Sequence, residues 1–223
     1  MPEKASDSRG IFISFEGGEG VGKTTQIRML ADFLRAQGKE VMLVREPGGT
    51  QLGEDVRKIL KFSDYDNEIS PQAEALLFAA ARAQLVRETI LPALGRGTWV
   101  LSDRFTDSSI AYQGAGRALG SGDITAINRF ATGGLEPAMT ILLDLPAREG
   151  FARLRSRAAE NSGKSDRMEA LASDFYERVR AGYLALANAA PQRFFVVAAD
   201  KAPEKIAEEI RNELSKRFAG ISR

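Results

Sequence analysis

The chain has 223 residues, and its 31 lysines and arginines nearly balance 30 aspartates and glutamates, for a formal net charge of +1. This balance gives no general positive field for nucleic acid or a membrane surface. The sequence contains no cysteine and no histidine, which excludes disulfides, thiol nucleophiles, imidazole bases and conventional zinc sites. Any catalysis must therefore use Lys, Arg, Asp, Glu, hydroxyl groups, the backbone and a bound metal ion.

Strand-like and helix-like patterns alternate along the chain. Residues 1–9 are polar without an apolar core, which predicts a flexible N-terminal tail and not a signal peptide. Strands are predicted at Ile11–Phe15, Glu40–Val44, Trp99–Ser102, Thr140–Leu143 and Phe194–Val197. Helices are predicted at about 24–37, 51–61, 71–94, 123–132, 146–160, 168–189 and 203–218. The alternation indicates an α/β fold of three layers, with a five-stranded parallel sheet covered by helices on both faces.

No repeat or long linker divides residues 10–223, which are predicted to form a single domain. Its ligands should lie beyond the carboxyl ends of the strands. The polar segment 158–166 is the best candidate for a mobile loop. The longest apolar runs are too short to span a bilayer, so we expect a cytoplasmic protein with no membrane partner.

One motif, which begins at Gly17, predicts binding of nucleotide phosphates. It reads Gly-Gly-Glu-Gly-Val-Gly-Lys-Thr-Thr and fits G-x-x-x-x-G-K-[ST] between a predicted strand and a predicted helix. Backbone N–H groups and the helix N-terminus would surround the anion, Lys23 would reach the β- and γ-phosphates, and the Thr24 hydroxyl would bind Mg2+. The predicted phosphate-binding residues are Gly17, Gly18, Glu19, Gly20, Val21, Gly22, Lys23, Thr24 and Thr25.

Charged residues follow several predicted strands. Asp103 stands where P-loop enzymes place a carboxylate near magnesium, often through water, although a strand-end Asp also caps segments. Arg104 suits a second anion better than a core. Glu46 before Pro47 indicates a turn or a cis bond, and an ion pair between Arg45 and Glu46 stays equally open.

Four blocks of sequence resemble the thymidylate kinase family, in the order of that family. The blocks are Phe15–Thr25, Arg45–Thr50, Asp103–Phe105 with Ser108–Gly114, and Asp166–Glu169. Many enzymes share the P-loop block, whereas Arg-Glu-Pro-Gly-Gly-Thr and Asp-Arg-Phe with Ala-Tyr-Gln-Gly are far more selective. The resemblance covers about residues 10–205.

The resemblance implies transfer of the γ-phosphoryl group from Mg-ATP to dTMP, giving dTDP and ADP for dTTP synthesis, by a homodimer. This chemistry suits a chain without histidine. The dTMP phosphate has a second pKa of about 6 and is largely a dianion at neutral pH, so it needs no general base. It needs cations that bring two polyanions together out of water.

The resemblance also assigns residues to the acceptor phosphate. Glu16 and Asp103 would orient the metal's waters or the acceptor. Arg57 and Arg104 would bind the dTMP phosphate, with Lys23, Asp103 and Arg104 as catalytic groups. As a helical residue near Glu54, Arg57 could equally form a surface pair.

A thymine pocket is implied around Phe78 and Arg82, whose spacing of four places them on one helix face. Phe78 would stack on the base and Arg82 would donate to a thymine carbonyl, while Tyr112 would exclude a ribose 2′-hydroxyl. Taken alone, Phe78 would more often be an ordinary core residue, and only the family context favours a role on the base. The remaining implied substrate-binding residues are Glu46, Pro47, Ser109 and Gln113.

A lid is implied at about residues 153–167, a segment rich in arginine and lysine. The P-loop has Glu19 where some family members carry a basic residue, and the basic lid then resembles the bacterial-type subclass. Arg155 or Arg157 would contact the transferring phosphoryl group; their spacing puts them on different helix faces, so one of them should point inward. A solvated basic helix face is the alternative.

Two other functions stay open at this point. Another nucleoside or nucleoside monophosphate kinase would share the scaffold, although Phe78, Arg82 and Tyr112 argue for thymine. A P-loop switch protein would have no use for a second phosphate site at Arg57 and Arg104. The end of the last predicted strand resembles the family's adenine-binding corner, yet a plain connection to a helix starting at Pro203 explains it equally well.

Overall fold

The sheet of this protein has five parallel strands, as predicted. The structure, a computed structural model, describes residues 10–62, 69–160, 173–218 and 220. The strands are β1 (Phe12–Glu16), β2 (Val41–Arg45), β3 (Trp99–Asp103), β4 (Met139–Asp144) and β5 (Phe194–Ala198). Their order across the sheet is β2-β3-β1-β4-β5. The N-terminal tail predicted at 1–9 and residues 161–167 of the predicted lid lie outside the described residues.

The helices agree with the predicted pattern except in two regions. They are α1 (Lys23–Ala36), α2 (Gln51–Phe62), α3 (Pro71–Leu85), α4 (Leu91–Gly95), α5 (Thr106–Ser109), α6 (Ser121–Thr132), α7 (Ala147–Glu160), α8 (Ser173–Ala189) and α9 (Pro203–Arg217), with π-helical turns η1 (Val86–Ile90) and η2 (Ile110–Gly116). The long helix predicted at 71–94 is interrupted by η1. The sequence did not predict α5 and η2, because the serine, glycine and β-branched residues of this segment have low helix propensity.

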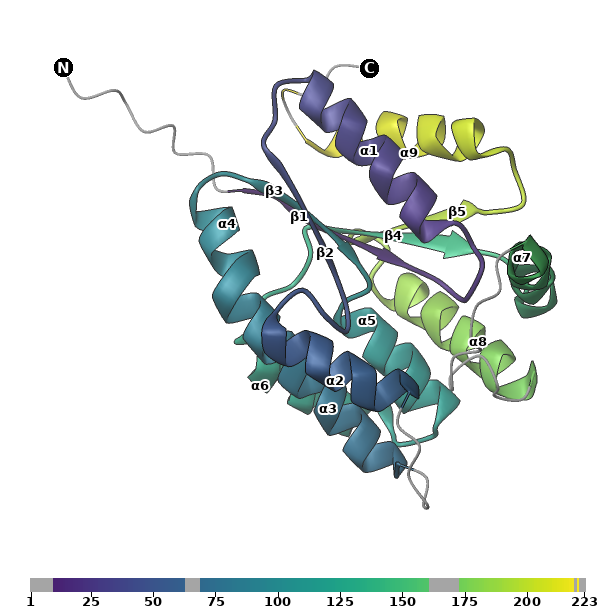
Figure 1. Ribbon diagram of the computed structural model, residues 1–223. Coiled ribbons are helices and arrows are strands. Elements are labelled where there is room, and N and C mark those ends of the chain that lie inside the picture. The colour runs from purple at the N-terminus through teal and green to yellow at the C-terminus, as the bar shows by residue number, and fades with distance from the viewer. Residues whose placement is uncertain (1–9, 63–68, 161–172, 219, 221–223) are drawn as a thin grey trace.

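The helices cover both faces of the sheet (Figure 1). Helices α1 and α9 lie on one face, and α4, α5, α6 and α8 lie on the other. Alternate residues of β1 serve the two layers, because successive side chains of a strand point to opposite faces. Ile13 and Phe15 pack with α1 and α9, whereas the Phe12 ring meets the Phe105 ring edge-on, with centroids 4.8 Å apart. Burial on both faces explains the nearly continuous apolar strands.

Small residues hold η2 close to α8. A Cβ atom on Gly116 would lie 2.6 Å from the Phe175 ring, and one on Gly182 would lie 2.8 Å from the Ala115 side chain. Larger side chains at these glycines would therefore push the two elements apart. In the part of the chain that the structure describes, no helix is both long and apolar enough to cross a membrane.

The register of the sheet brings three strand ends together. Asp103 at the end of β3 lies beside Phe15 of β1 and beside Arg45 of β2. The loops that follow these strands contain the P-loop, the Glu46–Pro47 turn and Arg104. The carboxyl edge of the sheet therefore collects the charged residues of the sequence motifs, as expected for a parallel sheet.

Candidate active site

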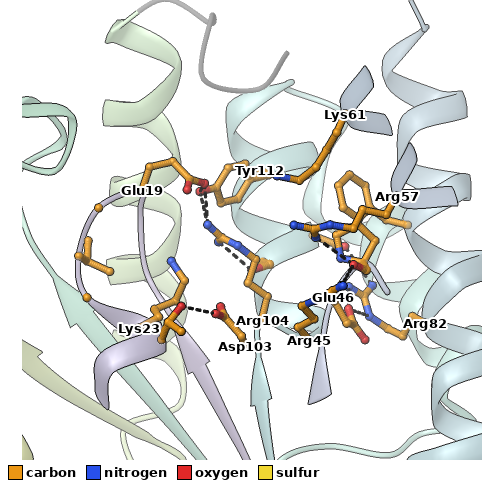
Figure 2. Close-up of a pocket in the computed structure, with 18 of the residues that line it drawn as sticks. Glu19, Lys23, Arg45, Glu46, Arg57, Lys61, Arg82, Asp103, Arg104 and Tyr112 are labelled. Atoms are coloured by element: carbon orange, nitrogen blue, oxygen red, sulfur yellow. Dashed lines mark hydrogen bonds and ion pairs between the residues drawn. The ribbon is translucent and has the colours of Figure 1, made fainter. Parts of the chain in front are cut away.

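A cavity of about 290 Å3 opens at this edge of the sheet (Figure 2). Most of the predicted site residues line it: Glu19, Gly20, Val21, Gly22, Lys23, Thr24, Thr25, Glu46, Pro47, Arg57, Phe78, Arg82, Asp103, Arg104, Ser109, Tyr112 and Gln113. Arg45, Lys61, Ser108 and Leu154 complete the lining. Glu16, Gly17 and Gly18 are not part of it.

The P-loop forms one wall of the cavity. Gly22 has φ 93° and is the N-cap of α1, a left-handed conformation that glycine adopts without strain. The Lys23 ammonium donates to the carbonyl oxygens of Gly17 at 3.1 Å and Gly18 at 2.7 Å. Burial, together with the positive charge of Arg104, lowers the pKa of Lys23 to about 8. The lysine is thus held at the loop beside a second cation.

Thr24 and Asp103 approach one another at the end of β3. The Thr24 hydroxyl donates to Asp103 Oδ2 at 3.3 Å, so both predicted metal-binding side chains present oxygen atoms at one place. Mg2+ prefers oxygen ligands, takes few from the protein and keeps several waters. Among the described residues, no cluster of three acidic, His or Cys side chains could hold a metal. The pair therefore fits an Mg2+ ion that nucleotide phosphates and water also coordinate.

Arg104 crosses the centre of the cavity from a strained backbone position. Its φ is 73°, a left-handed conformation that costs a non-glycine residue about 1–3 kcal/mol. Nη1 donates to the Gly17 carbonyl oxygen at 3.1 Å, and Nη2 donates to Glu19 at 2.6 Å and to the Tyr112 hydroxyl at 3.1 Å. The guanidinium also lies over the Tyr112 ring, 4.9 Å from its centroid. The surrounding contacts therefore fix the direction of this side chain.

Glu19 faces this arginine. Its carboxylate accepts a hydrogen bond from the Tyr112 hydroxyl at 2.9 Å and is the ion-pair partner of Arg104. Burial alone would raise the pKa of Glu19, but the charges of Arg104 and Lys23 outweigh it and lower the pKa to about 2. The side chain is therefore ionised at neutral pH, so only the backbone of Glu19 suits the predicted phosphate contact.

Glu16 lies below the cavity, and its contact with the metal's waters or the acceptor stays a prediction. It is fully buried. Its oxygens accept from the Phe105 N–H at 2.7 Å, the Ser108 hydroxyl at 2.6 Å and the Tyr183 hydroxyl at 2.9 Å. Burial, followed by the nearby charge of Asp107, raises the pKa of Glu16 to about 7. In this structure Glu16 supports the segment that contains Arg104.

The far end of the cavity is built around Arg82. This side chain is only 1% exposed. Its guanidinium donates to Glu46 through Nε at 2.8 Å and through Nη2, and to Ser109, to Asn128 and to the Phe105 carbonyl oxygen. These bonds occupy all five of its N–H donors. The predicted bond to a thymine carbonyl therefore requires Arg82 to share or exchange one of these contacts.

Glu46 and Arg45 do not pair with each other, although the sequence left that pair open. Glu46 pairs with Arg82, and Arg45 donates to Glu54 at 3.0 Å. The peptide bond between Glu46 and Pro47 is cis, one of the two forms that the sequence indicated. Arg57 donates to the Pro47 carbonyl oxygen at 3.0 Å and lines the cavity, so the turn is bonded from both β2 and α2.

Residues on α3 and η2 face this end of the cavity. Phe78 is half-buried on the lining. The Gln113 amide nitrogen donates to Glu74 at 3.0 Å. Tyr112 is buried with its hydroxyl on Glu19. The pocket is thus an aromatic slot bordered by polar groups, which suits a planar base.

The sequence matches one family over most of its length. The model of the family described as Thymidylate kinase matches residues 15–210.

The chain belongs to the thymidylate kinase family.

Curated relatives named thymidylate kinase match nearly the whole chain. The relative from Clavibacter sepedonicus is 50% identical over 202 residues, which cover 91% of this chain and 93% of its own. The relative from Deinococcus radiodurans is 48% identical over 210 residues, covering 94% and 98%. The relative from Kosmotoga olearia is 45% identical over 203 residues, covering 91% and 94%.

The segment predicted to form a lid is only partly described. Arg155 is exposed on α7 and does not line the cavity, while the Arg157 side chain and residues 161–172 lie outside the described part. The base of α7 touches the P-loop closely: a Cβ atom on Gly20 would lie 2.1 Å from the Gly150 carbonyl oxygen. The choice between Arg155 and Arg157 stays a prediction.

The sequence analysis did not identify several residues at the site. Ser108 and Tyr183 bond to Glu16, Asn128 bonds to Arg82, and Lys61 lines the cavity. Lys61 carried a usable signal, because it lies four residues after Arg57 on the same helix. No sequence pattern marked Asn128 and Tyr183, because only the packing of α6 and α8 brings them to the site.

Proposed function

We infer that this cavity is where the chain transfers the γ-phosphoryl group of ATP to dTMP, giving dTDP and ADP. One observation carries the assignment: Lys23 Nζ and Arg104 Nη1 donate to the same carbonyl oxygen, that of Gly17, each at 3.1 Å. The P-loop lysine and a second cation from β3 therefore converge on one point. Two phosphates bound by these groups would lie close enough to react.

Charge supports two phosphates in this cavity. The whole chain has a formal net charge of only +1, yet the lining contains six cationic and three acidic side chains. The cations are Lys23, Arg45, Arg57, Lys61, Arg82 and Arg104. Phosphoryl transfer is catalysed mainly by positioning and by stabilising charge on oxygen. A cavity of this composition suits that chemistry.

On the donor side, the P-loop backbone and Lys23 would bind the ATP phosphates. Thr24 and Asp103 would hold Mg2+, directly or through water. The ion, when bound, neutralises charge on the phosphate oxygens. Arg155 or Arg157 would complete this side when the lid covers the reacting groups and excludes water.

On the acceptor side, Arg104 and Arg57 would bind the dTMP phosphate. That phosphate is already largely a dianion near neutral pH, so no residue has to remove a proton. Arg104 would exchange its contact with Glu19 for the phosphate and keep its direction through Gly17. The base would stack on Phe78 beside Arg82, Ser109 and Gln113, and Tyr112 would pack where a ribose 2′-hydroxyl would otherwise fit.

We also propose that the chain acts as a homodimer. Helices α2, α3 and α6 lie side by side at one end of the molecule (Figure 1), and each exposes a large apolar side chain. These are Leu52, Leu76 and Phe130, of which Phe130 is 89% exposed. Apolar surface of this kind marks an interface, and a two-fold axis would pair the same patch on both copies.

The experiment that tests the function offers one acceptor at a time with Mg-ATP and measures ADP formation. The acceptors are dTMP, dUMP, dCMP, dGMP, AMP and thymidine. We expect turnover largely with dTMP and dTDP as its product. Turnover with another acceptor would keep the scaffold but overturn the roles of Phe78, Arg82 and Tyr112. Hydrolysis that is independent of any acceptor would favour a P-loop switch.

A further inference from the structure

Lys61 is a cation that lines the cavity. Neither the P-loop motif nor the other blocks that resemble the family include it. It lies in the last turn of α2, four residues after Arg57, and both side chains line the cavity. Residues four apart lie on one face of a helix. Figure 2 shows the Lys61 side chain directed from α2 toward Tyr112, with Glu19 across the cavity on the P-loop.

The charge of Lys61 acts across the cavity. It contributes, with Arg104 and Lys23, to the low pKa of Glu19 on the opposite wall, against the effect of burial. The Glu19 carboxylate lies 2.6 Å from the Arg104 guanidinium. The positive charge of Lys61 therefore also acts at the position of this guanidinium. Coulomb attraction between a lysine and a dianion at such a place is strong, because the walls exclude part of the water.

Another lysine on the same helix shows what a surface position looks like. Lys58 is 71% exposed and pairs with Asp55 at 2.9 Å, one turn earlier on α2. It does not line the cavity. Lys61 is half-buried and lines the cavity. The two lysines therefore provide a matched pair, of the same residue type and on the same helix, with different surroundings.

We propose that Lys61 is a further binding residue for the acceptor phosphate, approaching it from α2 beside Arg57. Its ammonium donates N–H groups to phosphate oxygens and adds a positive charge opposite Arg104. Because the charge comes from the acceptor-side helix, it strengthens binding of the nucleoside monophosphate and not of ATP. The inference rests on the proposed function, since it takes the ligand of Arg104 and Arg57 to be the dTMP phosphate.

The test compares ligands that differ only in the phosphate. Dissociation constants of dTMP and thymidine are measured by calorimetry for the unmodified protein, for Lys61→Met and for the control Lys58→Met. Because a charge-assisted hydrogen bond is lost, Lys61→Met should weaken dTMP binding about 5- to 20-fold. Thymidine binding should change less than about twofold, and Lys58→Met should affect neither ligand. Lys61→Arg should recover most of the dTMP affinity.

Three results would overturn the proposal. Equal weakening of dTMP and thymidine would show that Lys61 acts through structure. Unchanged binding of both would make it a surface lysine. Weaker binding of a non-hydrolysable ATP analogue, with dTMP unaffected, would place it on the donor side. A failure of the proposed function looks different: in the unmodified protein, dTMP would then bind no more tightly than thymidine.

Discussion

The two ends of the cavity are built differently. At the P-loop end, Arg104 and Glu19 form an ion pair whose side chains stay 16% and 26% exposed. At the other end, Arg82 and Glu46 form one whose side chains are 1% and 4% exposed. The first pair is accessible to a ligand, whereas the second belongs to the interior.

This difference separates exchangeable charge from structural charge. In its proposed role, the partly exposed guanidinium of Arg104 would exchange Glu19 for a phosphate. Arg82 has a protein partner for every N–H, and breaking a buried ion pair leaves an uncompensated charge. Under the proposed roles, the P-loop end would change partners when a phosphate binds, whereas the end that contains Arg82 is already assembled without a ligand.

The largest expected effect is a loss of stability when the buried Arg82–Glu46 pair is broken. Arg82→Leu should lower the free energy of unfolding by about 3–5 kcal/mol, because Glu46 would stay buried without its cation. Urea unfolding measures this. The control Arg45→Leu, which removes a half-exposed pair with Glu54, should cost about 0–1 kcal/mol. Equal losses in the two variants would contradict the distinction between the ends.

In the double variant Arg82→Leu with Glu46→Leu, much of the lost stability should return, because no unpaired charge remains buried. If the double variant were as unstable as the sum of the two single variants, the hydrogen bonds to Ser109, Asn128 and Phe105 would matter more than the ion pair. A double-mutant cycle separates these contributions.

Substitutions at the P-loop end should change ligand binding and catalysis. Arg104→Ala should weaken dTMP binding about 10- to 100-fold and leave ATP affinity nearly unchanged, since a charged contact to one ligand is lost. Lys23→Met should instead lower kcat about 100- to 1000-fold, as expected for a group that stabilises transition-state charge. Steady-state kinetics and calorimetry measure both.

Arg104→Gly is the matched variant for the backbone. Glycine tolerates φ 73° without strain, so Arg104→Gly removes the same guanidinium without the local cost that alanine would bear. The two variants should lose dTMP affinity equally. Equal loss of ATP and dTMP binding in both would show that the acceptor site lies elsewhere.

A smaller effect, on the pH dependence of stability, is expected from Glu16, which lies below the P-loop end of the cavity. Its pKa is raised to about 7 in the folded chain from an ordinary value near 4.5. Between these values the folded state holds a proton that the unfolded state has lost, so stability falls as pH rises from about 4.5 to about 7, by about 3 kcal/mol in total. Glu16→Gln should flatten this decline in urea unfolding series.

The decline should not vanish entirely in Glu16→Gln. Burial also raises the pKa of Glu46, against the opposing charge of Arg82, and this contributes in the same direction. An unchanged slope in Glu16→Gln would show that Glu16 does not take up a proton in the folded chain.

Local patterns predicted most of the fold. Each strand was placed within one residue of its observed start and end, because buried parallel strands are short apolar runs. The Thr106–Gly116 region was missed, since its helix depends on packing of Gly116 against Phe175 rather than on its own propensity. Tertiary contact decides such segments.

The site was predictable where a motif fixes the chemistry. Lys23, Thr24, Asp103 and Arg104 follow from P-loop spacing and strand ends, and the structure brings them to one cavity. Tyr183, which bonds to Glu16, and Asn128, which bonds to Arg82, could not be predicted, because they come from the distant helices α8 and α6. Sequence thus indicated which groups carry charge, and folding decided which of those charges are available to a ligand.

The adjacency of Asp103 and Arg104 has a consequence for rate. One turns toward Thr24 and the other toward Tyr112, so under the proposed roles the metal and the acceptor are held by neighbours joined by one peptide unit. Their Cα atoms are separated by a fixed 3.8 Å, as in any trans peptide. The spacing of these two backbone anchors is therefore set covalently, and a movement of α7 leaves it unchanged.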